Sequence, residues 1–198
     1  MAEEDYVSSV MDLHKEKNWR KIINNCSDDN DHSRLLWVFP SEENVAFIGD
    51  ALKNNNCRNV ISVGCGTGLL EWILMEALGI NVIGFEVDGA WWDCKYAPKA
   101  FIPLHLAKFH LKDDPVTQNL LKARRQALLF CYFNNGPAFE DYVKYFDGDM
   151  IFIIGPGEGR NTHTNPTPFN PNLGEEWNLM NSQEVRDTKD FIAVYQRC

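Results

Sequence analysis

The stretch "NVISVGCGTGLLEWIL", residues 59–74, places three glycines in five positions directly behind a short apolar run. Val60, Ile61 and Val63 form a run typical of a buried strand, whereas the apolar residues after the glycines recur with helical spacing. The stretch therefore predicts a strand, a glycine-rich turn and a helix. Three glycines in one turn indicate unusual backbone dihedral angles or the close approach of a ligand, with a connection that binds no ligand as the alternative.

The spacing of the glycines separates the cofactor classes. A dinucleotide fingerprint would need a glycine at Leu69, and a phosphate loop would need Gly-Lys followed by Ser or Thr, which does not occur here. The spacing Gly-x-Gly-x-Gly instead resembles the first motif of class I methyltransferases, which use S-adenosylmethionine (SAM) as cofactor. The resemblance implies that SAM is bound by Gly64, Cys65, Gly66, Thr67 and Gly68.

The next predicted strand supports this cofactor. The stretch "INVIGFEVD", residues 80–88, delivers Glu86 at its end, 18 residues beyond Gly68. In nucleotide-binding folds an acid about 20 residues after the glycines accepts hydrogen bonds from ribose hydroxyls. We predict that Glu86 binds the ribose and that Val87 belongs to the same site. Asp88 is a nearby competitor, and a solvated carboxylate at a strand end is the alternative.

The composition suits one globular domain with a sizeable core. The 198 residues are 44% hydrophobic and 12% aromatic. Nineteen basic and 28 acidic residues give a net charge of −9, which argues against nucleic acid as a partner because phosphate contacts need clustered Lys and Arg. No apolar stretch approaches the roughly 20 residues that span a bilayer, and "MAEEDYVSSV" lacks signal-peptide features. We therefore expect a cytoplasmic protein without a membrane partner.

The cysteines and histidines do not show metal-binding spacing. Cysteines at positions 26, 57, 65, 94, 131 and 198 form no Cys-x-x-Cys pair, so reduced thiols are expected. His105 and His110 have no further ligands nearby at a suitable spacing. The sequence therefore predicts no metal.

The chain divides into a leader and a domain. Residues 1–34 are predicted to be an N-terminal helical leader, because apolar residues recur among polar ones over 5–24. Residues 35–198 are predicted to be the SAM-dependent methyltransferase-like domain. Ser41 is a plausible N-cap of a helix that precedes the glycine-motif strand.

Strands and helices are predicted to alternate through the domain. After Glu86 we expect a short third strand around Phe101 to Leu104, a helix near Pro115, and a buried fourth strand in "ALLFCYFNN". The helix "PAFEDYVKYF", the strand "DMIFIIG" and two closing strands in "EEWNLMNSQEV" and "DFIAVYQR" follow. This alternation predicts an α/β, Rossmann-like class I methyltransferase fold: a mostly parallel seven-stranded sheet with a C-terminal antiparallel hairpin and helices on both faces.

The resemblance extends over roughly residues 35–197. The segments "LLWVFPSEENVAFI", "VGCGTGLLEW", "LLFCYFNN" and "FIIGPGEGR" occur in an order similar to that of a family of small methyltransferase-like proteins. Trp37 with Pro40 matches the family's Trp-x-x-Pro segment, and residues 157–159 match its Gly-Glu-Gly segment.

Three tryptophans are candidates for contact with the cofactor. Trp37, Trp91 and Trp92 are candidates for an aromatic wall that attracts the sulfonium cation of SAM, although core packing is the more frequent fate of a tryptophan. Trp37 is accordingly included in the predicted cofactor site.

The chain departs from the methyltransferase pattern at two places. The position two before the first glycine is usually acidic and is suited to the SAM amino group, but it is Ser62 here, which weakens the expected charge pairing. At the fourth strand the family's Trp-Pro-Pro element becomes Tyr132-Phe133-Asn134. The resemblance therefore does not identify the methyl acceptor.

Methyl transfer depends mainly on alignment of the acceptor with the methyl carbon. Tyr132 and Asn134 are predicted to orient the acceptor, and Glu158 lies on a loop that could cover the site. Tyr132 is equally suited to packing, and His163 is interpreted as a polar loop residue. The sequence thus predicts an enzyme, a SAM-dependent methyltransferase with a small-molecule acceptor. The alternative is a SAM-binding sensor or scaffold protein that is catalytically weak or inactive.

Overall fold

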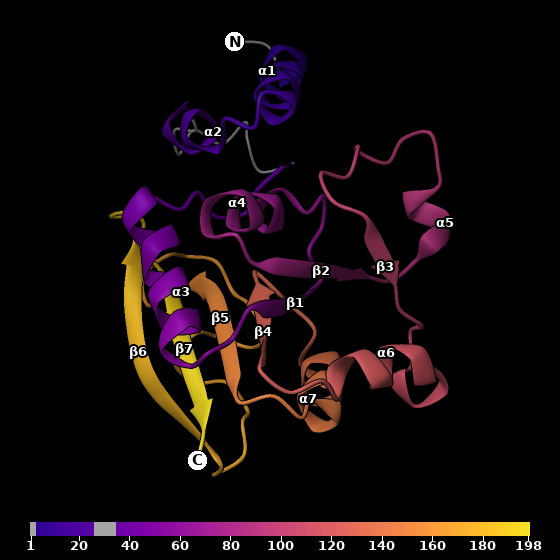
Figure 1. Cartoon of the computed structure of the whole chain (residues 1–198), viewed down its shortest axis with the longest axis vertical. Coiled ribbons are helices and arrows are strands. Elements are labelled where there is room, and N and C mark those ends of the chain that lie inside the picture. Colours follow the sequence, from indigo (N-terminus) through magenta and orange to yellow (C-terminus); the bar gives the residue numbers. More distant parts are fainter. Residues whose placement is uncertain (1–2, 26–34) are drawn as a thin grey trace.

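The computed structural model describes residues 3–25 and 35–198. Within these ranges the chain forms a seven-stranded sheet (Figure 1). The strands are β1 (Asn59–Val63), β2 (Asn81–Glu86), β3 (Leu104–Leu106), β4 (Gln126–Cys131), β5 (Met150–Pro156), β6 (Trp177–Val185) and β7 (Asp190–Arg197). Their order is β3-β2-β1-β4-β5-β7-β6, and only β7 runs antiparallel to its neighbours. The predicted mostly parallel sheet with a C-terminal hairpin is confirmed.

Helices cover both faces of the sheet, as predicted. They are α1 (Glu3–Lys15), α2 (Trp19–Asn25), α3 (Glu42–Asn54), α4 (Leu69–Leu78), α5 (Gly89–Trp92), the short 3-10 helix η1 (Leu111–Asp113), α6 (Pro115–Leu121) and α7 (Gly136–Tyr145). Buried residues of α1 to α4 join the core on one face, and those of η1, α6 and α7 join the core on the other (Figure 1).

The alternation of side chains along β1 decides which residues meet α4. Val60 belongs to the core beneath α1 to α4, whereas Ile61 and Val63 belong to the opposite core. Because successive side chains of a strand point to opposite faces, Ser62 shares the face of Val60. The hydroxyl of Ser62 is therefore buried under α4.

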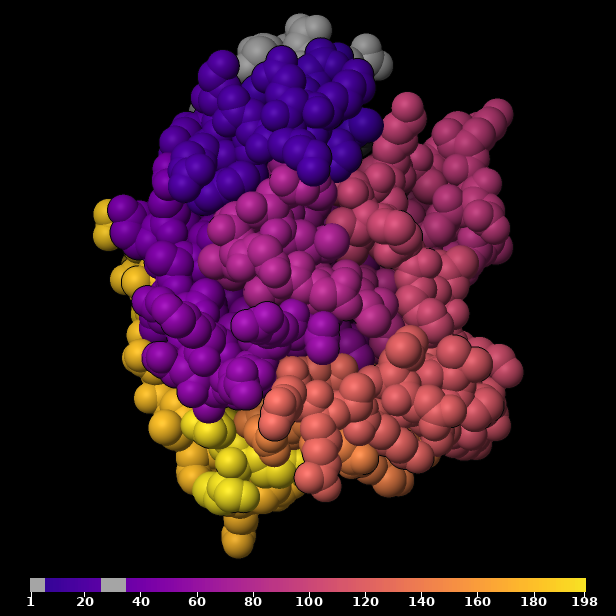
Figure 2. Space-filling model, in the orientation of Figure 1, coloured from indigo at the N-terminus to yellow at the C-terminus, as the bar shows by residue number. Residues whose placement is uncertain are grey.

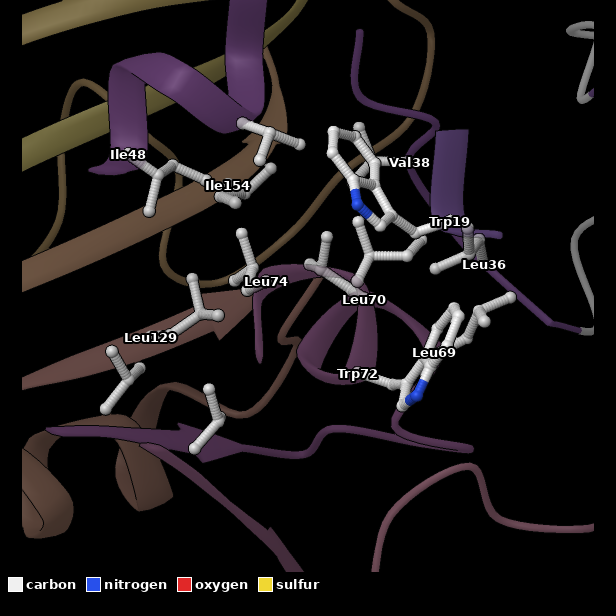
Figure 3. Close-up of a cluster of buried hydrophobic side chains, with 14 of the residues drawn as sticks. Trp19, Leu36, Val38, Ile48, Leu69, Leu70, Trp72, Leu74, Leu129 and Ile154 are labelled. Carbon is white, nitrogen blue, oxygen red and sulfur yellow. The ribbon is translucent and has the colours of Figure 1, made fainter. Parts of the chain in front are cut away.

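Helix α4 is the centre of the larger core. Its buried residues Leu70 and Leu74 pack with Trp19 of α2, Ile48 of α3 and Ile154 of β5 (Figure 3). Burial of such side chains contributes about 1.5 to 3 kcal/mol each. This packing fixes the helix that follows the glycine loop.

The N-terminal helices complete this core rather than form a separate one. Val10 and Leu13 of α1 and Ile22 and Ile23 of α2 are buried in the same cluster as α4. The two helices lie together at one end of the molecule, against the segment that contains α4 (Figure 2). The predicted helical leader is thus two helices, and its residues 1–2 and 26–34 lie outside the described residues.

The third strand lies later in the sequence than predicted. Strand β3 spans Leu104–Leu106 and pairs with β2 from Gly84 to Glu86. Phe101 and Ile102 are buried but serve another purpose, since the Phe101 amide donates to the Thr67 carbonyl at 2.8 Å. The apolar run that resembles a strand in the sequence therefore packs against the glycine loop.

One local prediction, the helix cap at Ser41, is confirmed by the structure. Ser41 caps α3 by accepting a hydrogen bond from the Asn44 amide at 3.2 Å. The five cysteines in the described part of the chain are free thiols. Within residues 3–25 and 35–198, no helix is both long and apolar enough to cross a membrane.

Candidate cofactor site

The glycine loop joins β1 to α4 at the carboxyl ends of the parallel strands. Gly64, Gly66 and Gly68 have φ angles of 69°, 59° and 75°, in the left-handed region that favours glycine. A Cβ atom on Gly64 would lie 2.9 Å from the Phe133 ring, and one on Gly68 would clash with Ile102. A Cβ on Gly66 would meet no described atom within 4 Å. The loop is therefore packed at its two ends and open at its centre.

Glu86 contacts the glycine loop at Gly66, the open centre of the loop. At the end of β2, its Oε1 accepts a hydrogen bond of 2.6 Å from the Gly66 amide. Burial raises the pKa of Glu86, while hydrogen bonds from the Gly66 and Val87 amides and the Trp92 side chain oppose that shift. The half-buried carboxylate is thus held beside the glycine loop by the Gly66 amide.

A first cavity of about 360 Å³ opens beside Glu86. Its wall comprises Val63, Gly64, Phe85, Glu86, Val87, Phe109, His110, Leu111, Phe133, Asn135, Pro137, Ala138, Asp141 and Tyr142. Most of these residues lie at or beyond the carboxyl ends of β1 to β4, the edge at which parallel α/β sheets bind ligands. A largely apolar wall with a few polar groups suits a small organic ligand.

A second cavity, of about 160 Å³, shares Gly64 and Phe133 with the first. Its wall also contains the predicted site residues Trp37, Cys65, Gly66, Thr67, Tyr132 and Asn134. Residues from the segment before α3, the glycine loop and the end of β4 therefore meet here. Gly68 and Glu158 belong to neither wall, and Val87 contributes to the first.

The second cavity contains an acid that the sequence analysis missed. Glu71 of α4 is 1% exposed, and its Oε1 accepts a hydrogen bond of 2.6 Å from the Ser62 hydroxyl. Burial, with a smaller contribution from the charge of Glu86, raises the pKa of Glu71 to about 7 against the effect of the Ser62 hydrogen bond. The signal was available, because Glu71 is a single acid within the apolar run of residues 69–74.

Tyr132 is held by a polar network. Its φ of 51° lies in the left-handed region, and its hydroxyl donates to Asp190 Oδ1 at 2.6 Å. Asp190 also accepts from the Arg160 Nε at 3.2 Å and is 2% exposed. Burial raises the pKa of Tyr132, and the negative charge of Asp190 raises it further. As a donor to a carboxylate, the hydroxyl is poorly suited to take a proton from an acceptor.

The remaining candidates are distributed around the site. Trp37 is 64% exposed and stacks on Tyr132, with ring centroids 5.9 Å apart and an interplanar angle of 14°. Trp91 lies in the wall of a different cavity beside α1, so the three tryptophans do not form one aromatic wall. Asn134 is exposed at the second cavity, and Glu158 is exposed on the turn after β5.

No family model and no curated protein sequence matches this chain. Solved structures match nearly all of it. An O-methyltransferase from Bacillus cereus in complex with SAH is similar over 98% of this chain and 91% of its own, with a TM-score of 0.50 and 14% identity. A candidate O-methyltransferase from Klebsiella pneumoniae is similar over 97% and 89%, with a TM-score of 0.51 and 8% identity. A mutant of MtNAS is similar over 98% and 74%, with a TM-score of 0.55 and 11% identity.

The chain has the class I methyltransferase fold. At these identities the likeness shows the fold, and function has to be argued from the site. The glycine loop and Glu86 lie together at the carboxyl ends of β1 and β2, where the Gly66 amide donates to Glu86. The narrower resemblance to one family of small methyltransferase-like proteins stays a prediction.

Proposed function

We propose that the protein is a SAM-dependent methyltransferase with a small-molecule acceptor. The observation that carries this proposal is the pairing of Glu86 with the open backbone of Gly66 at a cavity of about 360 Å³. A strand-end carboxylate beside an open glycine loop suits a ribose with two neighbouring hydroxyls. The similar fold of the Bacillus cereus O-methyltransferase, solved with SAH, supports the same class of cofactor.

The residues present fit the parts of SAM. Glu86 would accept hydrogen bonds from the ribose hydroxyls, and Phe109, Leu111 and Phe133 provide apolar surface for adenine in the first cavity. Because Gly64 and Phe133 belong to both walls, the amino-acid end of the cofactor can extend toward the second cavity. When bound, SAM supplies a methyl group on a sulfonium, and the protein contributes position and surrounding charge.

The charge of the two walls favours a cation over a phosphate ligand. The first wall contains two acids, Glu86 and Asp141, and the second wall contains Glu71. Among the described residues, the two walls contain no Lys or Arg, and His110 is their one basic residue. Phosphate-binding sites rely on cationic side chains or free helix amides. SAM is cationic and contains no phosphate, so it suits this site better than a dinucleotide.

The acceptor is proposed to be a small molecule that needs little help in losing its proton. Asn134, exposed at the wall of the second cavity, offers an amide that could orient it. Tyr132 contributes through the ring that stacks on Trp37, because its hydroxyl is engaged by Asp190. A neutral amine or a readily ionised oxygen would need orientation more than a general base.

The alternative function is a SAM-binding sensor or scaffold without turnover. It is favoured by the hydrogen bond from the Tyr132 hydroxyl to Asp190, because a hydroxyl bonded in this way is not free to accept a proton from the substrate. Incubation with methyl-labelled SAM and a metabolite extract separates the two functions. Labelled product with an equal amount of S-adenosylhomocysteine (SAH) supports the enzyme. Tight SAM binding with neither product supports the sensor, and a chain that binds no SAM contradicts both.

A further inference from the structure

Glu71 is a buried carboxyl group that the fold leaves half satisfied. One oxygen, Oε1, accepts the 2.6 Å hydrogen bond from Ser62. The other, Oε2, is buried and has no hydrogen-bond partner anywhere in residues 3–25 and 35–198. Buried polar atoms of folded proteins are nearly always paired, so each exception requires a reason. A ligand that supplies the missing donor is one such reason.

The position of Glu71 connects this oxygen with the candidate cofactor site. The residue lies in the first turn of α4, directly after the glycine loop, and belongs to the wall of the second cavity. That wall contains no Lys, Arg or His among the described residues. The facing titratable groups are Glu86, the thiols of Cys65 and Cys131, and Tyr132, whose hydroxyl is bonded to Asp190. The site is therefore acidic and contains no cation of its own.

Ser62 links this acid to the methyltransferase motif. The motif is expected to have a carboxylate at position 62, at the end of β1, but that side chain is a hydroxyl group. The Ser62 hydroxyl donates to Glu71 across the space between strand and helix. A carboxylate, that of Glu71 on α4, is thus hydrogen-bonded to the strand position at which the motif expects an acid.

We propose that Glu71 is the carboxylate that binds the α-ammonium group of SAM, in place of the acid missing at Ser62. This inference rests on the proposed function and deepens it, because it assigns the amino-acid end of the cofactor to the second cavity. Ser62 holds Oε1, and the ammonium donates to Oε2. The positive end of the α4 dipole near Glu71 favours the ionised carboxylate that this pairing needs.

Two ligands separate the amino-acid end from the adenosine end. SAH carries the ammonium group, whereas methylthioadenosine keeps adenosine and the thioether but lacks the amino-acid part. Glu71→Gln, which keeps the size of the side chain, should weaken SAH by about ten- to a hundredfold and leave methylthioadenosine within about twofold. Glu86→Ala is the matched comparison and should weaken both ligands. Calorimetry gives the four affinities, and a thermal melt shows that each variant is folded.

The outcomes distinguish this inference from the proposed function. A parent protein that binds neither ligand overturns the proposed function and this inference with it. If the parent binds both ligands but Glu71→Gln weakens them equally, or does not weaken SAH at all, only the assignment of Glu71 is overturned.

A second measurement needs no variant that might misfold. Burial favours the protonated form of Glu71 in the free protein, so pairing with an ammonium group should release a proton to solvent. The thiols of Cys65 and Cys131 stay protonated, because burial raises the pKa of each. Calorimetry near pH 6 in two buffers of different ionisation enthalpy should show release of about one proton with SAH and less than half as much with methylthioadenosine. Equal release with both ligands would contradict the pairing.

Discussion

The two ends of the candidate site differ in how their polar groups are satisfied. At the glycine loop, no described atom lies within 4 Å of a Cβ built on Gly66, and Glu71 Oε2 has no partner among the described residues. At the end of β4, the Tyr132 hydroxyl, the Asp190 carboxylate and the Arg160 guanidinium bond to one another. The first end has unused space and bonding capacity, whereas the second is closed by its own contacts.

Because of this difference, the site restricts the chemistry of the proposed cofactor more than that of the acceptor. Open backbone and an unpartnered buried oxygen call for a ligand with specific donors, so the chemistry of the cofactor can be inferred. A network that satisfies itself stabilises the fold and places few demands on a substrate. The site therefore constrains the acceptor less closely than it constrains the cofactor.

The largest expected effect is at the open glycine. Gly66→Val should reduce SAM affinity by about a thousandfold or more, because the new side chain would fill the space above the loop. Gly79→Val is a matched control, since Gly79 also has a left-handed φ of 64° with no described atom within 4 Å, at the far end of α4. Both variants should lose about 1 to 2 kcal/mol of stability through backbone strain. Normal SAM binding by a folded Gly66→Val variant, measured by calorimetry, would remove the loop from the cofactor site.

The next effect concerns Glu71 and the pH dependence of stability. Its pKa is about 7 in the folded chain and 4.5 ordinarily, so between these values the folded state keeps a proton that the unfolded state has released. Its contribution is complete below about pH 4.5 and is lost as the pH rises through 7, on the order of 3 kcal/mol in total. Glu71→Gln should remove this part of the decline, as measured by urea unfolding between pH 4.5 and 8.

An exposed carboxylate provides the control for this pH experiment. Asp50→Asn removes one negative charge from the exposed surface of α3 and controls for the change in net charge. If the pH profiles of Glu71→Gln and Asp50→Asn did not differ, Glu71 would not be the buried acid that titrates in this range.

A smaller effect tests the closed end of the site. Tyr132→Phe removes the hydrogen bond to Asp190 and should lower the free energy of unfolding by about 1 to 2 kcal/mol. SAM affinity should change by less than about threefold, because the hydroxyl points into the network. Tyr195→Phe loses a hydrogen bond to the Pro168 carbonyl away from both cavities and is the matched control. A selective loss of methylation of a hundredfold or more in Tyr132→Phe would show instead that the hydroxyl acts in catalysis.

The same contrast explains how far the sequence could predict the molecule. The glycine loop and Glu86 lie within 30 residues of one another and carry a motif with a physical meaning, so their roles could be proposed before the structure. Strand β7 has the same bounds as the predicted stretch "DFIAVYQR", because its apolar residues directly follow a polar turn. Phe101 and Ile102 misled the prediction of β3, because a short apolar run can fill a core without joining a sheet.

The contacts that were missed depend on long-range packing. The Tyr132 hydroxyl meets Asp190, 58 residues away, because β4, β5 and β7 are neighbours in the sheet. No local pattern carries that information. Glu71 was missed for a different reason: acids are usually exposed, and only the apolar residues on either side of it indicated burial.

The most direct test of the account is the affinity of SAH for Glu86→Ala and Asp88→Ala, measured by calorimetry. SAH is the neutral thioether, so a general attraction between acids and the sulfonium does not contribute. Asp88 lies two residues away, and its carboxylate caps α5 through the Trp91 amide at 3.2 Å. Glu86→Ala should weaken SAH by about ten-fold to several hundred-fold through the lost ribose hydrogen bonds, and Asp88→Ala should do less. If SAH bound both variants as tightly as the parent, the end of β2 would not hold the cofactor and the central claim would be wrong.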